Sequence, residues 1–378
     1  MRLVTFSFLA LMLVSPLAAQ QTSTTFNDSA AMPDSPVLHS DRRVTLGILA
    51  PKANQVELVD GILGAVLGGP QKMKKGEDGV WSITVGPLEP GIYDYGFSID
   101  GSTRLVDPAN TQVIERAWGP TSFFEVPGDA PNLAGARDVP RGALHIHHYD
   151  SKAVGRTRSV RVYTPAGYEK SGGATYPVLY LFHGSGGIDS QWTTVGRANF
   201  ILDNVIADGK AKPMIVVMTN GHVPQPKGVG RGRTANEGFE KDLIGDVMPL
   251  VESLYRVKPG RENRAIAGLS MGGGQSLQIG LAHLDLFSAV ASFSGAVRDL
   301  STIEAMSAAD LNKKLDLFWI GCGKDDFLFE ANNNLDKLLT EKKVKHVYRV
   351  SEGGHTWPVW RMYLSELAPL LFQDSAPD

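Results

Sequence analysis

A segment around residue 270 constrains the fold of this chain more than any other part of the sequence. The apolar run Arg264–Ala267 is typical of a strand, and residues 275–283 are typical of a helix. Between them, residues 268–272 read Gly-x-Ser-x-Gly. Glycines on both sides of Ser270 permit a tight turn that pushes the serine hydroxyl out of the backbone. The segment therefore predicts a serine presented at the end of a strand, rather than an ordinary helix N-cap.

Composition and charge narrow the class of protein. The 378 residues suffice for two domains, and a formal net charge of -3 gives no reason to expect nucleic acid or an anionic membrane as partner. The single cysteine, Cys322, allows neither an intrachain disulfide nor a cysteine metal cluster. Its apolar neighbours predict a small core residue.

The N-terminus has the pattern of a secretory signal peptide. A basic start is followed by the apolar run Leu3–Leu17 and by small residues, so we expect residues 1–19 to be removed. A membrane anchor is the alternative, but the run is shorter than the ~20 residues that a span needs. Residues 20–38 are polar and small and predict a linker. We expect a secreted or periplasmic protein without membrane association after signal removal.

Two different patterns follow. Residues 39–128 alternate apolar and polar positions between Asp-Gly turns, which predicts a small all-β sandwich. Residues 129–141 are rich in Pro, Gly and Ala and predict a second linker. Residues 142–375 predict a doubly wound α/β domain with helices such as 199–207 and 239–255, the second kinked at Pro249. Its strands are expected near residues 144–149, 158–163, 178–183, 214–218, 264–268, 289–293, 317–321 and 346–350.

Three candidate catalytic groups follow strands of this domain. Ser270 follows the fifth strand, Asp325 and Asp326 the seventh, and His355 the eighth. Serine, then acid, then histidine is the chain order of α/β-hydrolases, whose carboxyl strand ends form the ligand-binding edge. We expect His355 to take the Ser270 proton and return it to the leaving alcohol. Spacing alone does not decide which aspartate orients the imidazole.

The same scheme needs two backbone N–H groups that stabilise the negative oxygen of the transition state. One is expected from Met271, directly after the nucleophile. The other is expected from Ser185, within the glycine-rich run 183–187 that follows the third strand. The long polar loop 219–238, which contains Arg231 and Arg233, is a candidate cap over the pocket.

The α/β part resembles carbohydrate esterase family 1, the feruloyl and acetylxylan esterases, over nearly all of residues 142–371. The resemblance implies Asp326 as the acid, in a triad with Ser270 and His355, and it implies neither cofactor nor metal. His145 and His147 share a strand face, but no carboxylate or cysteine cluster accompanies them. The residues that carry the resemblance are Tyr180–Gly187, Gln191-Trp192, Gly268–Gln275, Cys322–Asp326 and Gly353–Trp357.

Aromatic side chains in these motifs suggest a substrate slot. We expect Trp192, Gln275 and Trp357 to bind substrate, with Trp360 as a further candidate wall for a phenolic acyl group or a sugar. The β-rich part resembles the immunoglobulin-like early-set domain related to family-48 carbohydrate-binding modules, through residues 91–101 and 106–108, which implies an immunoglobulin-like sandwich. Its Trp81 and Trp118 are expected in the core or between domains rather than on a glycan.

These observations predict a serine esterase that acts on feruloyl or other hydroxycinnamoyl esters of plant cell-wall polysaccharide, and hence in xylan degradation. The expected partner is an ester-decorated plant polysaccharide or oligosaccharide. Three alternatives remain: an acetylxylan esterase, a siderophore esterase of the enterochelin type, and a glycan-binding protein with a degenerate hydrolase domain.

Overall fold

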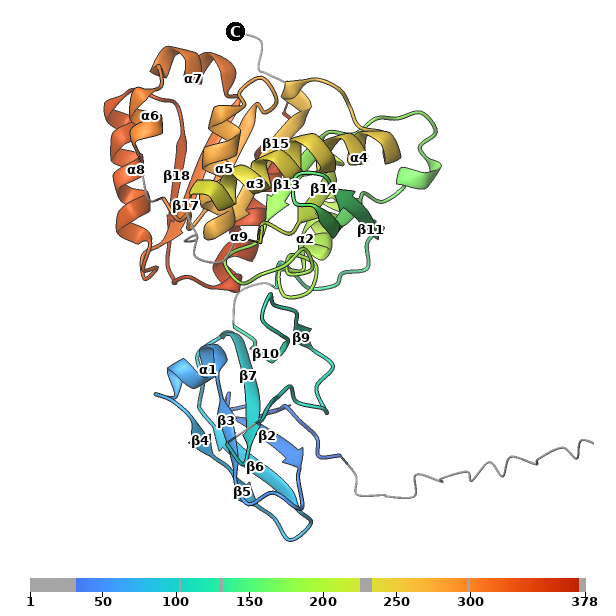
Figure 1. The fold of residues 1–378 in the computed structure, drawn as a ribbon, viewed down its shortest axis with the longest axis vertical. Coiled ribbons are helices and arrows are strands. Elements are labelled where there is room, and N and C mark those ends of the chain that lie inside the picture. The colour runs from blue at the N-terminus through green and yellow to red at the C-terminus, as the bar shows by residue number, and fades with distance from the viewer. Residues whose placement is uncertain (1–31, 102, 129–131, 225–232, 298–299, 374–378) are drawn as a thin grey trace, which may run out of the picture.

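The computed structural model describes residues 32–101, 103–128, 132–224, 233–297 and 300–373. The predicted signal peptide and most of the first linker lie outside these ranges. Figure 1 shows a front part of β-strands and a larger α/β part, with β9 and β10 of the front part at their junction. The described helices include none with the combined length and apolarity of a membrane span. The proposed domain limits at 39, 128, 142 and 375 remain predictions.

The front part consists of two antiparallel sheets over a shared core, as the alternating pattern predicts. Buried side chains of both sheets, such as Leu46, Leu58, Trp81 and Phe97, form one apolar cluster. One sheet has the order β1-β2-β6-β5 and comprises β1 (Val37–Leu38), β2 (Val44–Leu49), β5 (Lys74–Lys75) and β6 (Val80–Val85). The other has the order β4-β3-β7-β10-β9, with β8 paired to β7, and comprises β3 (Val56–Val59), β4 (Gln71–Lys72), β7 (Gly91–Ile99), β8 (Thr103–Leu105), β9 (Val113–Ile114) and β10 (Thr121–Val126).

One helix of the front part was not expected from its sequence. α1 (Gly61–Val66) contains two glycines and has little intrinsic helix propensity. Its start is held by tertiary contacts: the Ile62 N–H donates to Asp94 Oδ1 at 2.8 Å, and the Asp94 carboxylate also pairs with Arg116 at 2.8 Å. A buried carboxylate at the start of a helix favours the helical turn where propensity does not.

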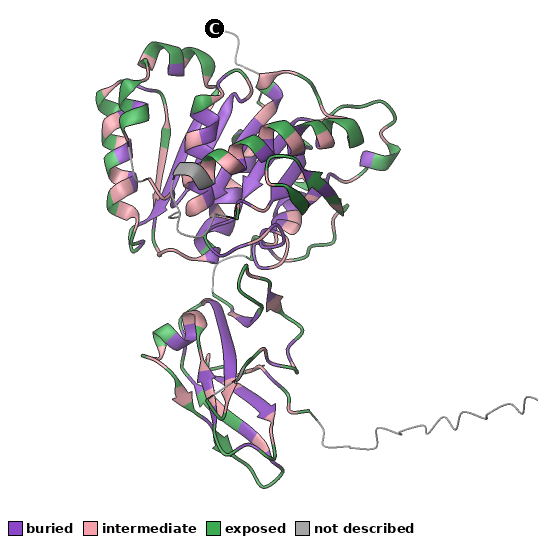
Figure 2. Ribbon diagram, viewed as in Figure 1, coloured by how far each residue is buried: buried purple, intermediate pink, exposed green. Residues whose placement is uncertain are grey.

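The α/β part is built on a mixed eight-stranded sheet, which confirms the predicted fold class. All eight expected strands are present, in the order β11-β12-β14-β13-β15-β16-β17-β18; β11, β12 and β14 pair antiparallel, and the strands from β14 to β18 are parallel. Figure 2 shows that the central strands are buried, whereas the edge strand β11 is largely exposed. They are β11 (Ala143–Ser151), β12 (Arg156–Thr164), β13 (Val178–Phe182), β14 (Ile215–Thr219), β15 (Arg264–Leu269), β16 (Ala289–Phe293), β17 (Leu317–Gly323) and β18 (Val347–Ser351).

Helices cover both faces of the sheet, since alternate strand residues belong to two separate apolar clusters. One face packs on α2 (Ala198–Ala207) and α9 (Trp357–Leu367). The other packs on α3 (Arg233–Asp242), α4 (Met248–Leu254), α5 (Met271–Ala282), α6 (Ser301–Ala305), α7 (Ala308–Lys314) and α8 (Phe329–Glu341). The helix predicted at 239–255 is interrupted by a π-helical turn, Leu243–Val247, directly before Pro249, which lacks the N–H that a regular helix needs.

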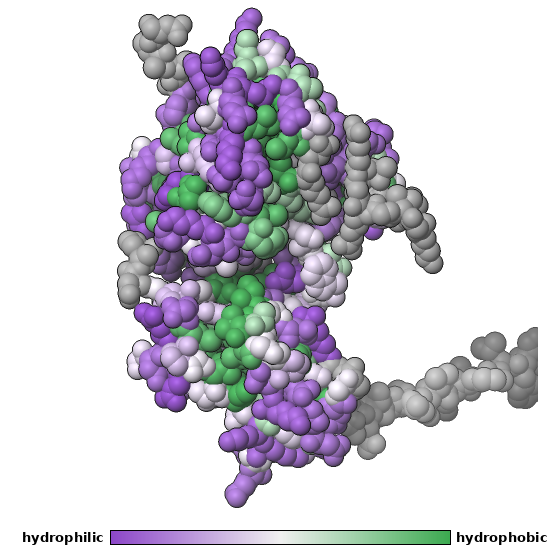
Figure 3. Space-filling model, turned by 90° about the vertical axis from the view of Figure 1, so that its left-hand side faces the viewer, coloured by the Kyte–Doolittle hydropathy of each residue, from purple (hydrophilic) through white to green (hydrophobic). Residues whose placement is uncertain are grey.

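The two parts meet through buried residues. Ile92, Ile114 and Phe123 of the front part belong to the same apolar cluster as α2 and α9. Arg361 of α9, 5% exposed, pairs with Glu125 at 2.9 Å and also donates to the Val195 carbonyl. Figure 3 shows apolar surface gathered at this junction. The two parts therefore share an interior rather than touch at their surfaces.

Candidate active site

Ser270 sits in a strained turn between β15 and α5. Its backbone angles are φ 53 and ψ −115, a region that costs a non-glycine residue of order 1–3 kcal/mol. The turn is held because the Ser270 N–H donates to Phe293 O at 2.8 Å and Ala296 N–H donates to Ser270 O at 2.9 Å. A Cβ on Gly272 would overlap the His183 carbonyl oxygen, so this glycine permits the close approach of the loop after β13. The geometry is that of a nucleophile elbow.

Asp326 and His355 form a hydrogen-bonded pair beyond β17 and β18. The His355 Nδ1–H donates to the Asp326 carboxylate, with distances of 2.8 and 3.0 Å to its two oxygens. Burial alone would raise the pKa of Asp326, but hydrogen bonds from His355, the Leu328 N–H and Ser294 outweigh it and lower that pKa. Asp325 is exposed, and its N–H donates to Gly353 O instead. The carboxylate in contact with His355 is therefore that of Asp326.

Two aromatic rings contact the His355 imidazole. The buried Trp360 ring stands perpendicular to it, with centroids 4.8 Å apart, and donates its Nε1–H to Ser294 Oγ. The second ring is that of Phe327, which is 77% exposed and has its centroid 4.5 Å from that of His355. The sequence interpretation overlooked Ser294 and Phe327. Ser294 could have been found, because Ser294-Gly295 follows a strand just as Ser270 does. The exposure of Phe327 could not, because it depends on the arrangement of loops that are distant in sequence.

The glycine-rich loop after β13 lies against the elbow. A Cβ on Gly184 would stand 3.2 Å from Ser270 Cβ. His183 fixes the start of this loop: its Nδ1–H donates to Gly184 O at 2.7 Å, and its Nε2 accepts the Gly221 N–H at 2.9 Å. Accepting the Gly221 N–H requires an unprotonated Nε2 and hence a neutral imidazole, and burial lowers the His183 pKa to about 4.

The two predicted oxyanion donors remain available. Within the described part of the chain, no hydrogen bond uses the N–H of Ser185 or that of Met271. Met271 is the first residue of α5, where a backbone N–H has no partner within the helix. The described hydrogen bonds also include none between Ser270 and His355; such bonds are often long before substrate binds.

The predicted substrate-binding residues lie in the interior. Trp192, Gln275 and Trp357 are 1%, 2% and 7% exposed. Trp192 Nε1–H donates to Phe182 O, and Gln275 Nε2 donates to Gly221 O, so both hold backbone near the site. Side chains so deeply buried leave little surface for a ligand. The tryptophans, Trp360 included, support the site from within, and a substrate-binding role for Trp192, Gln275 and Trp357 remains a prediction.

The first residues of the 219–238 loop, 219–224, also support the site. Asn220 and His222 accept hydrogen bonds through their carbonyls from Arg158, which is buried and pairs with Asp242 at 3.2 Å. Arg231 lies outside the described residues, and a capping role for the loop remains a prediction. Histidine, cysteine and carboxylate side chains of the described residues form no group of three that could hold a metal ion. His147 bonds Tyr255 Oη at 2.5 Å, and His145 bonds Thr164.

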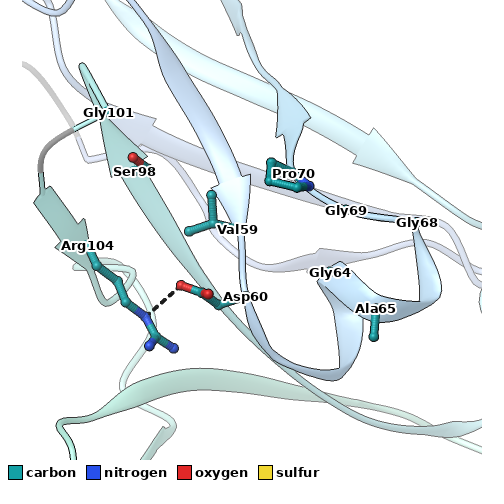
Figure 4. A pocket seen from close by; sticks show the side chains of 10 residues that line it. All are labelled: Val59, Asp60, Gly64, Ala65, Gly68, Gly69, Pro70, Ser98, Gly101 and Arg104. Carbon is teal, nitrogen blue, oxygen red and sulfur yellow. Dashed lines mark ion pairs between the residues drawn. The ribbon is translucent and has the colours of Figure 1, made fainter.

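Two hollows lie away from these groups. Figure 4 shows one in the front part, where Asp60 pairs with Arg104 at 2.8 Å beside the glycines that follow α1. The other lies at the amino ends of the parallel strands and is lined by Tyr176, Lys258 and Asp316 among others. Neither contains a residue of the Ser270, Asp326 and His355 group, so neither is the catalytic cleft.

The strand order and the places of Ser270, Asp326 and His355 along it are those of an α/β-hydrolase. The family model described as putative esterase matches residues 151–371, and the chain belongs to this esterase family. The predicted resemblance to carbohydrate esterase family 1 is confirmed. The relation of the front part to early-set domains remains a prediction.

Curated proteins with esterase names align with this chain over different lengths. An endo-1,4-beta-xylanase/feruloyl esterase of Xylanibacter ruminicola is 33% identical over 345 residues, which cover 89% of this chain and 46% of that protein. An esterase of Mycobacterium tuberculosis is 33% identical over 153 residues, 40% of this chain and 32% of that protein. The chain thus spans about half or less of the length of these relatives.

Solved structures show the same fold. A ferulic acid esterase matches with 28% identity and a TM-score of 0.55, covering 61% of this chain and 97% of its own. The enterobactin esterase of Shigella flexneri matches with 19% identity and a TM-score of 0.63, over 87% of this chain and 92% of its own. At that identity, the second match speaks for the fold alone.

Proposed function

We propose that this chain hydrolyses carboxylic esters with Ser270 as nucleophile, His355 as general base and acid, and Asp326 as the orienting carboxylate. The hydrogen-bonded pair of Asp326 and His355 at the edge that presents Ser270 carries this proposal. His355 Nε2 accepts the Ser270 proton as Oγ attacks the ester carbonyl, and then gives it to the leaving alcohol. Water, activated by the same imidazole, releases the acid from Ser270. The Met271 and Ser185 N–H groups stabilise the oxyanion in both steps.

The serine mechanism is tested by Ser270→Ala. We expect this variant to lose several orders of magnitude in ester hydrolysis while its thermal unfolding stays close to that of the wild type. A fluorophosphonate probe should label the wild type and not the variant. Turnover near the wild-type rate in Ser270→Ala would contradict the mechanism, and absent labelling of the wild type would favour a degenerate, glycan-binding protein.

For the substrate, we propose feruloyl and related hydroxycinnamoyl esters on plant cell-wall polysaccharide such as xylan. The relative named as a feruloyl esterase aligns with 89% of this chain, and the exposed Phe327 ring offers an aromatic surface directly beside His355. An acetyl ester also has an observation in its favour, because an acetyl esterase of Caldicellulosiruptor saccharolyticus is 25% identical over 165 residues. A siderophore ester, the third substrate considered from the sequence, is the remaining alternative.

These substrates are separated by comparing rates on methyl ferulate, acetylated xylan and a cyclic catecholate triester. Preference for ferulate supports the feruloyl assignment, and Phe327→Ala should then raise KM for methyl ferulate but not for p-nitrophenyl acetate. Acetate release alone would assign an acetylxylan esterase, and hydrolysis of the triester alone a siderophore esterase.

We further propose export of the chain, because polysaccharide substrates lie outside the cell and residues 1–19 have the pattern of a signal peptide. N-terminal sequencing of protein from the periplasm or medium should begin after Ala19. A retained Met1 would contradict removal of this segment.

A further inference from the structure

Gly186, in the loop after β13, has both polar backbone groups bound by distant segments of the chain. Its N–H donates to His222 Nε2 at 2.8 Å. Its carbonyl accepts the N–H of Ala117 at 3.0 Å. Ala117 lies in the front part, in the turn that joins β9 to β10. The residue before Gly186 is Ser185, the proposed second oxyanion donor, so this loop is clamped directly beside a catalytic group.

The next residue of the same turn, Trp118, packs on Gly186. A Cβ added to Gly186 would overlap the Trp118 ring, which therefore lies directly over the glycine α-carbon. Much of the Trp118 side chain is open to solvent, since it is 58% exposed. Gly186 also has φ +75, in the left-handed region. The loop thus adopts a conformation suited to glycine at the point where a ring from the front part covers it.

The residues that hold Gly186 are themselves fixed; we call Ala117, Trp118 and His222 the clamp. The turn joins two strands whose Ile114 and Phe123 are 1% and 6% exposed and belong to the apolar cluster of the α/β part. Glu125, later in β10, pairs with the buried Arg361. On the opposite side of Gly186, His222 is carried by the segment that the buried Arg158 holds. Both partners of Gly186 are therefore fixed by buried contacts.

We propose that the front part is a working component of the catalytic site: Ala117 and Trp118 position the oxyanion loop through Gly186. They are positioning residues, and the inference rests on the proposed serine mechanism. An oxyanion donor must stand 2.7–3.1 Å from the place of the developing oxyanion, so small displacements of Ser185 reduce the stabilisation of the transition state. Binding of the substrate in its ground state is much less sensitive to these displacements. Loosening the clamp should therefore lower kcat and leave KM nearly unchanged.

The test uses Trp118→Ala in the full chain, with p-nitrophenyl acetate, a small ester that needs no aromatic or sugar pocket. We expect kcat to fall roughly tenfold or more, KM to change less than about twofold, and a boronic acid that forms a tetrahedral serine adduct to bind more weakly by a similar factor. Trp118→Phe should recover most of the rate. Leu105→Ala, which removes another exposed apolar side chain of the front part, is the matched control and should change nothing.

Unchanged kcat and boronate affinity in Trp118→Ala would overturn the proposal. So would a rise in KM at constant kcat, because it would make Trp118 a substrate contact only. Failure of the serine mechanism itself shows separately, as hydrolysis that survives in Ser270→Ala.

A double-mutant cycle tests the contact directly. Gly186→Ala places a methyl group against the Trp118 ring and should lower kcat more than Trp118→Ala does. Combining the two substitutions relieves the overlap, so the combined loss should be smaller than the product of the single losses. Strictly multiplicative losses would show that ring and loop act independently, which contradicts the proposal.

Discussion

At the scale of single residues, burial distinguishes the carboxylate that contacts His355 from its neighbour of the same type. The motif resemblance indicated Asp326 rather than Asp325, and the structure gives the physical reason: one carboxylate is buried against His355 and the other is solvated. Burial also bears on the tryptophans of the motifs. Trp192 and Trp357 are large, but sequence does not reveal that both side chains are buried in one apolar cluster.

The two aspartates provide a matched pair of variants. Asp326→Asn keeps the volume but removes the charge that stabilises the imidazolium, so we expect kcat to fall by about three to four orders of magnitude. Asp325→Asn should stay within about twofold of the wild type. Steady-state kinetics on one soluble ester checks both, and a larger loss from Asp325→Asn would contradict the assigned acid.

His183 gives the site a pH-dependent stability. Its pKa is about 4 in the folded chain against 6.5 for an ordinary histidine, because burial disfavours the charged form. Between these values the unfolded chain binds the extra proton, so this contribution to stability is complete above pH 6.5 and is lost as the pH falls towards 4, at about 1.4 kcal/mol per pH unit. Urea unfolding at several pH values should show a shallower dependence in His183→Gln. An equal dependence would mean that His183 is not held neutral.

At the scale of elements, apolar runs and turn signals predicted all eight strands of the large sheet. The apolar runs are continuous in central strands such as β13 and β14, where both faces of the sheet are covered. α1 was missed because tertiary contacts to Asp94 override its weak propensity. The loops were predicted least well. Which residues meet over Ser270 depends on segments that are distant in sequence, such as Gly221 with His183 and Ala117 with Gly186.

The elbow glycine Gly272 allows a prediction at this scale. A methyl group there would overlap the His183 carbonyl oxygen and the Phe182 backbone, so Gly272→Ala should destabilise the fold by about 1–3 kcal/mol and lower kcat. Gly245→Ala is the control, because its added Cβ meets nothing within 4 Å. Urea unfolding and initial rates measure both. Wild-type behaviour of Gly272→Ala would show that loop and elbow are not in tight contact.

At the scale of the whole molecule, the junction is the decisive feature, and of the residues that form it the sequence indicated only Trp118, expected in the core or between domains. Composition indicated two parts and a linker, but alternation along β9 and β10 does not show that Ile114 and Phe123 face a neighbouring domain. Arg361 likewise reads as an ordinary helix residue, although it is buried against Glu125.

Two glutamates of the front part test the junction. Glu125→Ala leaves the buried Arg361 guanidinium without its carboxylate, and we expect a loss of about 1–3 kcal/mol in the free energy of unfolding, discounted for the partial exposure of Glu125. Glu115→Ala removes an exposed partner, 3.7 Å from Arg161, and should change stability by less than about 0.5 kcal/mol. Equal effects in a denaturant titration would show that the junction pair is not special.

The shared interior has a consequence for how such molecules evolve and are engineered. A front part exchanged for an unrelated one would leave the surface around α2 and α9 uncovered and Arg361 without its counter-charge. A chimera joined at the segment between the two parts should therefore be less stable, unless Ile92, Ile114, Phe123 and Glu125 are kept together with α9. The alignment with the Xylanibacter ruminicola protein covers 89% of this chain and so includes both sides of the junction, as expected for a pair inherited together. We therefore expect functional chimeras to exchange the front part and the α/β part together.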